Sequence, residues 1–249
     1  MGAAPELVED TDRLWVHKVL ARSSPASSAR ARSVRRAQQI VDAARQLATT
    51  KGADFTTHDL VREARVALQT FYNQFSGKDE VLLAVLEDLI AERCTGLARQ
   101  AEAIPDPLAR LQLFLRAVVE VPNADSPSVP GSRFVTTEHW RLQQLYPADL
   151  ALITGRFDAL VATELRRATA AGMLHSEDPD HDAWLTTQLV MAVFHQNAFT
   201  IAPGRRVETA ERVWEFCLRA WGSQAVNQRS NRTPRRQRRR AVGVRPSAR

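Results

Sequence analysis

The sequence has little of what a membrane protein or a disulfide-bonded domain requires. Its 249 residues include only two cysteines, Cys94 and Cys217, far apart in the chain, which excludes a disulfide framework and a four-cysteine zinc site. No segment approaches the roughly 18 consecutive apolar residues of a membrane-spanning helix. The first twelve residues carry four acids and no base, the wrong sign for a secretory signal. We therefore expect a cytoplasmic protein whose thiols are buried and reduced.

Lysine is also scarce, and the net charge of +6 is unevenly distributed. Residues 13–36 contain seven basic residues and no acid, and residues 222–249 contain nine arginines and no acid. The intervening residues 37–221 hold 18 basic against 24 acidic residues, a balance of −6. The basic charge therefore lies in two end segments, which suits a polyanion such as DNA but is equally consistent with a solvated surface.

The alternation of period two that marks β-strands is missing, and apolar residues instead recur at helical spacing. The sequence therefore predicts an all-α protein. Beyond Pro105, five helices are expected, and a loop with three prolines, Pro122 to Gly131, separates the first two. The expected helices are 107–121, 133–145, 148–171, 179–201 and 207–222.

In the N-terminal part, apolar residues from Ala37 to Ala48 predict a long helix that Lys51 and Gly52 end with a basic residue and a permissive glycine. We expect the ordered protein to start near Val34. Residues 1–34 are interpreted as a basic extension that contains one candidate amphipathic helix around Leu14 to Leu20.

Two short helices are expected next. Thr56 and Thr57 offer hydroxyls that can cap a helix with a narrow apolar face. After a connection at residues 65–67, the run from Leu68 to Phe75 predicts a second helix, and Lys78 opens a long one. Two crossed short helices braced by longer ones form a helix-turn-helix unit.

Two stretches resemble the N-terminal domain of TetR/AcrR-family transcriptional regulators: Gly52-Ala53-Asp54-Phe55-Thr56-Thr57, and Thr70-Phe71-Tyr72-Asn73-Gln74-Phe75-Ser76-Gly77-Lys78-Asp79-Glu80-Val81. The order and spacing agree over about 45 residues. One position departs from the family pattern, because Arg65 stands where the turn usually has glycine. A left-handed backbone at this arginine would cost about 1–2 kcal/mol. A phosphate contact of the side chain could compensate for this cost. The alternative is a slightly different turn from which Arg65 points into solvent.

The resemblance implies a regulator, expected to be a repressor, that a small-molecule effector releases from DNA by shifting the long helix that starts near Lys78. The implied organisation is a helix-turn-helix DNA-binding domain at 35–82 and a helical-bundle domain for ligand binding and dimerisation at 83–222. The basic extension at 1–34 precedes them, and a disordered Arg-rich tail at 223–249 follows. The expected partners are a second copy of the chain, a near-palindromic double-stranded operator and an unknown effector; no cofactor, metal or membrane partner is expected.

In a helix-turn-helix protein the second helix enters the major groove, where its outward side chains reach base edges. Phe71 and Phe75 are expected in the core. The side chains expected to face DNA are Leu68, Gln69, Thr70, Tyr72 and Asn73. The resemblance also places four residues near the phosphate backbone: Thr57, Tyr72, Gln74 and Lys78.

The last two predicted helices carry more apolar faces than one side of a bundle requires, which favours an intermolecular four-helix bundle; the alternative is that all of these residues pack internally. Aromatic, Met and His residues could line an effector pocket, although core packing explains the same pattern. The pocket candidates are Phe114, Phe134, His139, Trp140, Leu142, Phe157, Trp184, Met191 and His195. The acidic cluster at residues 178–182 is interpreted as a helix cap rather than a metal site.

Two other functions compete with a regulator. The basic ends suit a protein that coats DNA without sequence preference, which would bind any duplex with similar affinity and with a steep salt dependence. An enzyme has little support, because the sequence has no glycine-rich phosphate loop, no metal-ligand spacing and no strand that could carry a nucleophile elbow.

Overall fold

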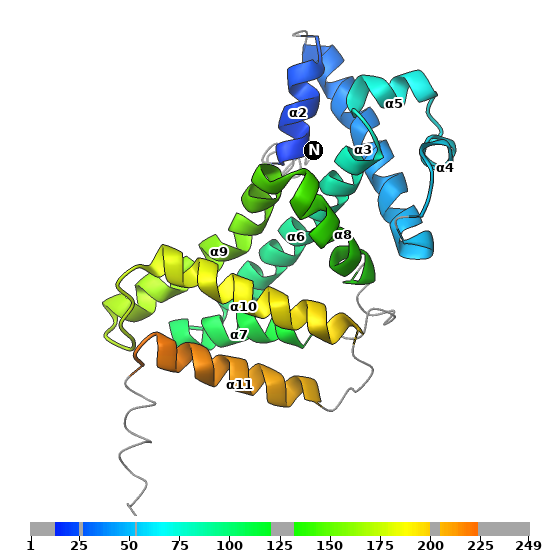
Figure 1. The fold of residues 1–249 in the computed structure, drawn as a ribbon. Coiled ribbons are helices and arrows are strands. Elements are labelled where there is room, and N and C mark those ends of the chain that lie inside the picture. The colour runs from blue at the N-terminus through cyan, green and yellow to red at the C-terminus, as the bar shows by residue number, and fades with distance from the viewer. Residues whose placement is uncertain (1–12, 25–26, 53, 121–131, 200–204, 224–249) are drawn as a thin grey trace, which may run out of the picture.

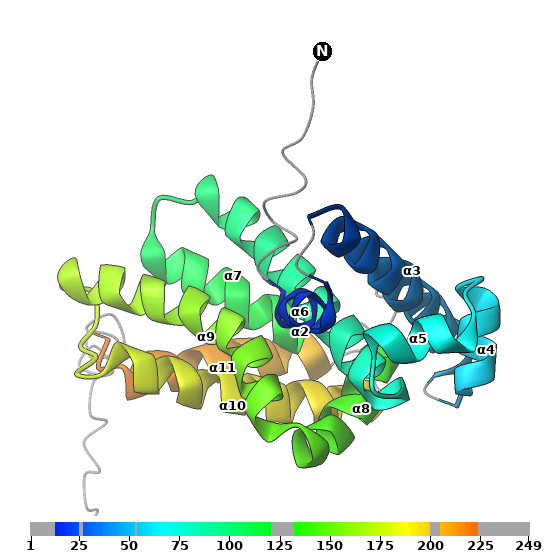
Figure 2. The same cartoon turned by 90° about the horizontal axis from the view of Figure 1, so that it is seen from above.

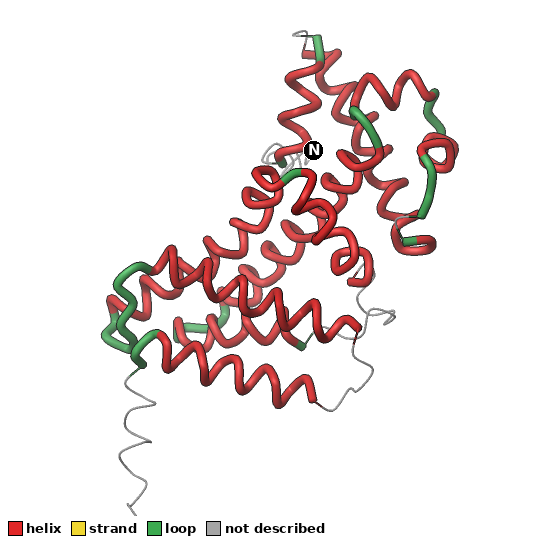
Figure 3. The backbone as a smooth tube through the Cα atoms, viewed as in Figure 1, coloured by secondary structure: helices red, strands yellow, loops and turns green. Residues whose placement is uncertain are grey.

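The computed structural model describes residues 13–24, 27–52, 54–120, 132–199 and 205–223. For residues 132, 133, 198, 199, 205 and 206 it describes the backbone only. Within these ranges every regular element is a helix (Figure 3), which confirms the all-α prediction. None of these helices is long and apolar enough to cross a membrane. The helices are α2 (Leu14–Arg22), α3 (Ser27–Lys51), α4 (Thr57–Glu63), α5 (Leu68–Gln74), α6 (Lys78–Glu102), α7 (Pro107–Val119), α8 (Ser132–Leu145), α9 (Pro147–Ala170), α10 (Pro179–Phe199) and α11 (Arg205–Ala220).

Two long helices, α6 and α9, pack against each other and connect the two ends of the molecule (Figure 1). Helices α2 to α5 gather at one end around the start of α6, and α7, α10 and α11 pack with α9 at the other end. The view from above shows α4 and α5 standing out on the side opposite the C-terminal bundle (Figure 2). The short pair of helices is therefore presented at one extremity of the protein.

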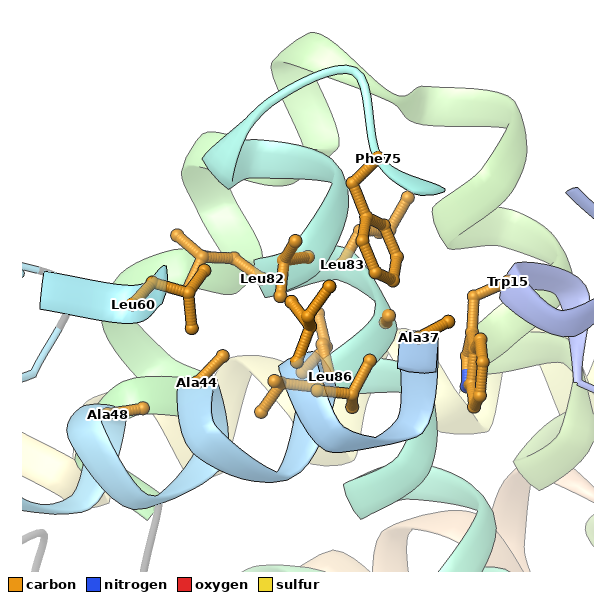
Figure 4. Packing of buried hydrophobic residues seen from close by; sticks show 14 of the residues in the cluster. Trp15, Ala37, Ala44, Ala48, Leu60, Phe75, Leu82, Leu83 and Leu86 are labelled. Atoms are coloured by element: carbon orange, nitrogen blue, oxygen red, sulfur yellow. The ribbon is translucent and has the colours of Figure 1, made fainter. Parts of the chain in front are cut away.

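The N-terminal end is built on a single apolar cluster that draws on α2 to α6 and on the facing parts of α8 and α9. Figure 4 shows Leu60, Phe75, Leu82 and Leu86 pointing toward one another between α3 and α6. Each large side chain buried in this way stabilises the fold by about 1.5–3 kcal/mol. The cluster holds the two short helices, which are too short to be stable alone.

Helix α2 belongs to this core, so the expectation that the ordered protein starts near Val34 is wrong. The candidate amphipathic helix around Leu14 is confirmed, and α3 already begins at Ser27. The carboxylate of Glu87 accepts hydrogen bonds from the backbone N–H groups of Leu14 (2.6 Å) and Trp15 (3.1 Å). Because these contacts cross more than 70 residues of sequence, no local pattern could reveal them.

The indole of Trp15 is buried and donates a hydrogen bond to Asp88 Oδ1 at 3.0 Å. Burial raises the pKa of Asp88 to about 6, and the Trp15 hydrogen bond and the Arg13 guanidinium, 3.5 Å away, only partly oppose this rise. Lys18 reaches Asp149 of α9 at 2.5 Å. Helix α2 therefore ties the start of the chain to both α6 and α9.

The C-terminal end has its own apolar cluster, made by the second half of α6 with α7, α9, α10 and α11. All five helices predicted beyond Pro105 are present within two residues of the expected bounds. Both thiols are buried, and burial raises the pKa of Cys94 to about 11 and that of Cys217 to about 12. The expected Pro122–Gly131 loop and residues 224–249 of the expected tail lie outside the described residues, whereas Ser223 is buried.

The expected boundary between residues 82 and 83 falls inside α6, which runs unbroken from Lys78 to Glu102. Its first half contributes to the N-terminal cluster and its second half to the C-terminal cluster. A movement of α6 would therefore displace residues of both apolar clusters.

Candidate nucleic-acid interface

Helix α4 begins at a capping box. The Thr56 hydroxyl accepts a hydrogen bond from the Asp59 backbone N–H (3.1 Å), and the Asp59 carboxylate accepts one from the Thr56 backbone N–H (3.0 Å). These bonds from Thr56 lower the pKa of Asp59. Of the two candidate caps, Thr56 therefore has this role. Thr57 is the first residue of the helix and is half-buried.

The turn between α4 and α5 is closed by a residue in the left-handed region. Arg65 has φ 53° and is the only non-glycine residue with positive φ in the part of the chain that the structure describes. Val66 N–H donates to the Val61 carbonyl at 3.1 Å and Arg65 N–H to the Arg62 carbonyl at 3.2 Å. The Arg65 side chain is exposed. The strained alternative for this turn is therefore the one adopted, at a cost of about 1–2 kcal/mol.

Helix α5 is anchored by its aromatic face. Phe71 and Phe75 are buried, as expected, and their ring centroids lie 6.3 Å apart. The Tyr72 ring meets Phe71 edge to face at 5.1 Å. With one face held against the core, the opposite face of this seven-residue helix must point outward.

That outward face carries polar and small apolar groups. Tyr72 is 52 % exposed and Leu68 is 38 % exposed. Gln69 and Asn73 are exposed, and Gln69 Nε2 donates to Asn73 Oδ1 at 3.1 Å, while Thr70 is half-buried. The amides can donate to and accept from base edges, and Leu68 can contact a thymine methyl.

Two residues expected near the phosphates have other contacts here. Gln74 is buried, with 6 % exposure, so its side chain does not lie on the outward face and we remove it from the candidate set. Its carbonyl accepts a hydrogen bond from Arg22 Nη1 at 2.7 Å. Lys78 Nζ donates to the Phe55 carbonyl at 3.1 Å and lies 5.4 Å from the centre of the Phe55 ring. Lys78 therefore helps to hold the segment that leads into α4.

A comparison with protein families matches residues 40–85 to the bacterial regulatory proteins of the tetR family. The match covers the end of α3, both short helices and the start of α6, which is the unit whose geometry is described above. Residues 40–85 of this transcriptional regulator therefore form the DNA-binding unit of the tetR family.

The similarity to other proteins extends beyond this unit. The HTH-type transcriptional regulator EthR of Mycolicibacterium smegmatis is 25% identical over 186 residues, which are 72% of this chain and 84% of that protein. A TetR-family transcriptional regulator from Pectobacterium atrosepticum has a similar structure, with a TM-score of 0.64, 19% identity, and coverage of 77% of this chain and 96% of the other. RolR in complex with resorcinol has a TM-score of 0.58, 18% identity, and coverage of 79% and 92%. The similarity to these structures shows a shared fold.

Two of the regulator's candidate pocket residues come together between α8 and α10. The rings of His139 and His195 lie 5.1 Å apart. Burial, followed by the neighbouring His195, lowers the pKa of His139 to about 4, and burial also lowers that of His195. His139 Nδ1 and His195 Nε2 are buried and have no hydrogen-bond partner among the described residues. The pair is therefore neutral at pH 7 and has hydrogen-bonding capacity to spare.

The other pocket candidates are scattered. Trp140 is 66 % exposed, and Trp184 is 47 % exposed and stacks on His181 at 5.5 Å. Phe114 and Phe157 are buried in the C-terminal cluster, whereas Phe134 and Leu142 are buried in the N-terminal one. Met191 is half-buried. These residues therefore lie in different surroundings, and an effector pocket among them stays a prediction.

The surface of α10 and α11 is partly apolar. Much of the apolar surplus noted in these helices packs internally, including Phe194, Trp214 and Trp221. The side chain of Phe199 lies outside the described set. Among the described side chains of these two helices, four large apolar ones stay exposed: Trp184, Leu185, Val207 and Phe216. At the start of α10, the Asp178 carboxylate accepts from the His181 backbone N–H at 3.1 Å, in agreement with the cap interpretation.

Proposed function

We propose that the regulator binds a near-palindromic operator as a homodimer, represses transcription there, and is released by a small molecule that binds in the C-terminal bundle. The observation that carries the proposal is the two-faced geometry of α5, whose phenylalanines are buried while Tyr72 and Leu68 are exposed. In this arrangement Gln69, Thr70 and Asn73 read base edges, and Thr57, Tyr72 and Lys78 lie toward the phosphates.

The dimer has a geometric reason. One seven-residue helix contacts only a few base pairs, and two copies related by a two-fold axis can read half-sites about 34–36 Å apart on one face of DNA. The exposed apolar residues of α10 and α11 support this assignment, because a second copy of the same face would bury Leu185 and Phe216. We propose that these two helices form an intermolecular four-helix bundle.

The effector is proposed to bind beside the histidine pair. A buried polar atom without a partner costs about 1–3 kcal/mol, and a ligand that hydrogen-bonds His139 Nδ1 or His195 Nε2 recovers part of that cost. A neutral imidazole can donate or accept, so a hydroxyl or amide group on an otherwise apolar molecule fits the site. Its binding would shift α6 only if the ligand has different affinities for the two states of the protein.

The test is operator binding by the full chain. The wild-type protein first selects a duplex from a random-sequence library, and the affinities of Gln69→Ala and Tyr72→Ala for that duplex are then measured. Each variant is expected to bind about 5- to 150-fold more weakly, corresponding to about 1–3 kcal/mol, and Gln69→Ala should also relax base preference. Because both side chains are exposed, dimer mass and melting temperature should not change. Lys78→Ala is a poorer probe, since it also removes the contact with the Phe55 carbonyl.

Leu152→Ala, on the exposed face of α9, is the matched control and should bind like the wild type. Wild-type affinity in both α5 variants would refute the assigned contacts. Equal affinity of the wild-type protein for the selected duplex and for a scrambled one would instead favour the DNA-coating alternative.

A further inference from the structure

The basic N-terminal segment divides into two groups in the structure. Three of its seven basic residues belong to α2 or its N-cap and form ion pairs with acidic residues of other helices. These three residues therefore have a structural role. These pairs are Arg13 with Asp88 at 3.5 Å, Lys18 with Asp149 at 2.5 Å, and Arg22 with Glu80 at 2.8 Å.

The other four form what we call the arginine surface of α3: Arg30, Arg32, Arg35 and Arg36. All four side chains are exposed, and none forms an ion pair or hydrogen bond with any residue in the described ranges. The first acid that follows them on α3, Asp42, accepts a hydrogen bond from Gln38. Four unbalanced positive charges on about two turns of one helix therefore face solvent.

Arginines elsewhere on the surface differ from this group. Many exposed arginines outside the segment pair with a nearby acid. Examples are Arg45 with Glu92, Arg62 with Asp59, Arg166 with Asp180, and Arg212 with Glu208. Within the described residues, the unpaired positive charge is therefore densest at the start of α3.

That place adjoins the recognition helix. Helix α3 packs against α5, and Arg22, five residues before α3 begins, donates a hydrogen bond to the carbonyl of Gln74, the last residue of α5. The start of α3 and α5 lie at the same end of the molecule (Figures 1 and 2). Helix α5 is about 10 Å long and the major groove is about 12 Å wide, so α5 would occupy the groove itself. Elements beside α5 would then lie over the phosphates that border the groove.

We propose that the arginine surface of α3 binds the DNA phosphate backbone outside the base pairs that α5 reads. The inference rests on the proposed operator binding and extends its footprint on each side. Phosphate contacts fix position and add affinity but carry no sequence information. Arg32 and Arg35 lie on the solvent side of α3, away from its buried Ala37 and Ile40, which leaves both guanidinium groups accessible.

The experiment uses the full chain carrying Arg32→Gln and Arg35→Gln together. Its affinity is measured over a range of salt concentrations for the selected duplex in two forms, one embedded in about 40 base pairs and one trimmed to the selected site. The control is the double variant Arg99→Gln and Arg166→Gln, which removes the same net charge from exposed positions at the far ends of α6 and α9. Arg99 has no acidic partner among the described residues, whereas Arg166→Gln also gives up the pair with Asp180.

On the long duplex, the α3 variant should lose about 0.9 from the log-log salt slope for each phosphate contact, or about eightfold in affinity per contact at 0.1 M salt. The control should match the wild type. On the trimmed duplex, the α3 variant and the wild type should converge, because the flanking phosphates are gone. The preference for the selected over a scrambled sequence should be unchanged in both variants.

An α3 variant that matches the wild type on the long duplex overturns the proposal, and so does an equal loss on both duplexes, which would put the arginines on the core site. A loss shared with the control would reduce the effect to overall charge and also overturn it. The proposed function fails separately, through Gln69→Ala and Tyr72→Ala, so the two failures can be distinguished.

Discussion

Among the described residues, the two ends of the regulator differ in how completely their buried polar side chains are hydrogen-bonded, since the buried atoms without a partner all follow α6. In the N-terminal half, the buried carboxylates have several partners each. Glu80 accepts from Arg22 and from both the backbone and hydroxyl of Ser76; burial raises its pKa, but these bonds outweigh burial and leave the pKa lowered. Between α8 and α10, by contrast, His139 and His195 each have a buried nitrogen for which the described part of the chain supplies no partner.

This difference indicates different demands on the two halves. A recognition helix has to be held in one orientation, and a fully bonded set of carboxylates under α2 and α5 favours a single arrangement. Unpaired polar atoms reduce stability and mark a place where a ligand can bind. The same chain thus combines a rigid DNA-reading end with an interior that remains incompletely bonded.

The largest expected effect tests the rigid half. Trp15→Ala should lower the free energy of unfolding by about 3–5 kcal/mol, because it removes a buried indole and leaves a cavity between α2 and α6. Trp15→Phe keeps most of the packing but loses the hydrogen bond to Asp88 and should cost about 1 kcal/mol. Urea unfolding measures both, with the exposed Leu152→Ala as control. A loss below about 1 kcal/mol in Trp15→Ala would mean that α2 is not part of the core.

The next effect sharpens the contrast through pH. The pKa of His139 is lowered from 6.5 to about 4 in the folded protein, so the unfolded chain binds the extra proton first as the pH falls. The stability from this residue is present above pH 6.5 and is lost as the pH drops toward 4, by at most about 3 kcal/mol at 1.36 kcal/mol per unit.

His139→Phe should therefore reduce the loss of stability between pH 7 and pH 4 by about 2 kcal/mol, which urea unfolding at several pH values would measure. His17→Gln, on the exposed side of α2, serves as control and is expected to follow the wild type. If His139→Phe loses as much stability in acid as the wild type, the buried neutral histidine pair is not the source of the pH dependence.

The smallest effect concerns the turn before α5. Arg65→Gly should raise the free energy of unfolding by up to about 1 kcal/mol. Glycine accepts φ 53° and so avoids the strain of about 1–2 kcal/mol, but it also makes the unfolded chain more flexible, which cancels part of that gain. Arg65→Ala keeps the strain and should not stabilise. Thermal unfolding compares the two variants. Weaker operator binding by the more stable Arg65→Gly would favour the phosphate contact over the solvent-exposed alternative, and a less stable Arg65→Gly would contradict the strain.

Local sequence signals predicted the elements well wherever the physics is local. Helical periodicity located the five helices beyond Pro105, and Gly52, with φ 62°, ends α3 as its lack of a side chain allows. The outward face of α5 was also predictable, because Phe71 and Phe75, four residues apart, can only share the buried side. Spacing of this kind depends on a few neighbouring residues.

Other features depended on residues distant in sequence. The burial of Gln74, the capping of α2 by Glu87 and the pairing of Arg22 with Glu80 each join segments more than 50 residues apart or depend on such contacts. The first turns of α3 have no apolar face and therefore gave no helical signal, although the helix includes them. Spacing could not separate the pocket candidates from core residues for a related reason, since a helical stripe has the same spacing whether it meets core, solvent or ligand.

The order of residues alone determined that this chain is helical, where most helices begin and end, and which side chains of α5 other than Gln74 face outward, because hydrogen bonding and periodic burial along a helix are local. Only the tertiary structure decided which of the basic residues near the start are used in ion pairs and which remain exposed beside α5. It also decided that the two distant histidines His139 and His195 meet. Charge pairing and ring contacts depend on which helices pack together, and the spacing of residues along the chain does not specify that.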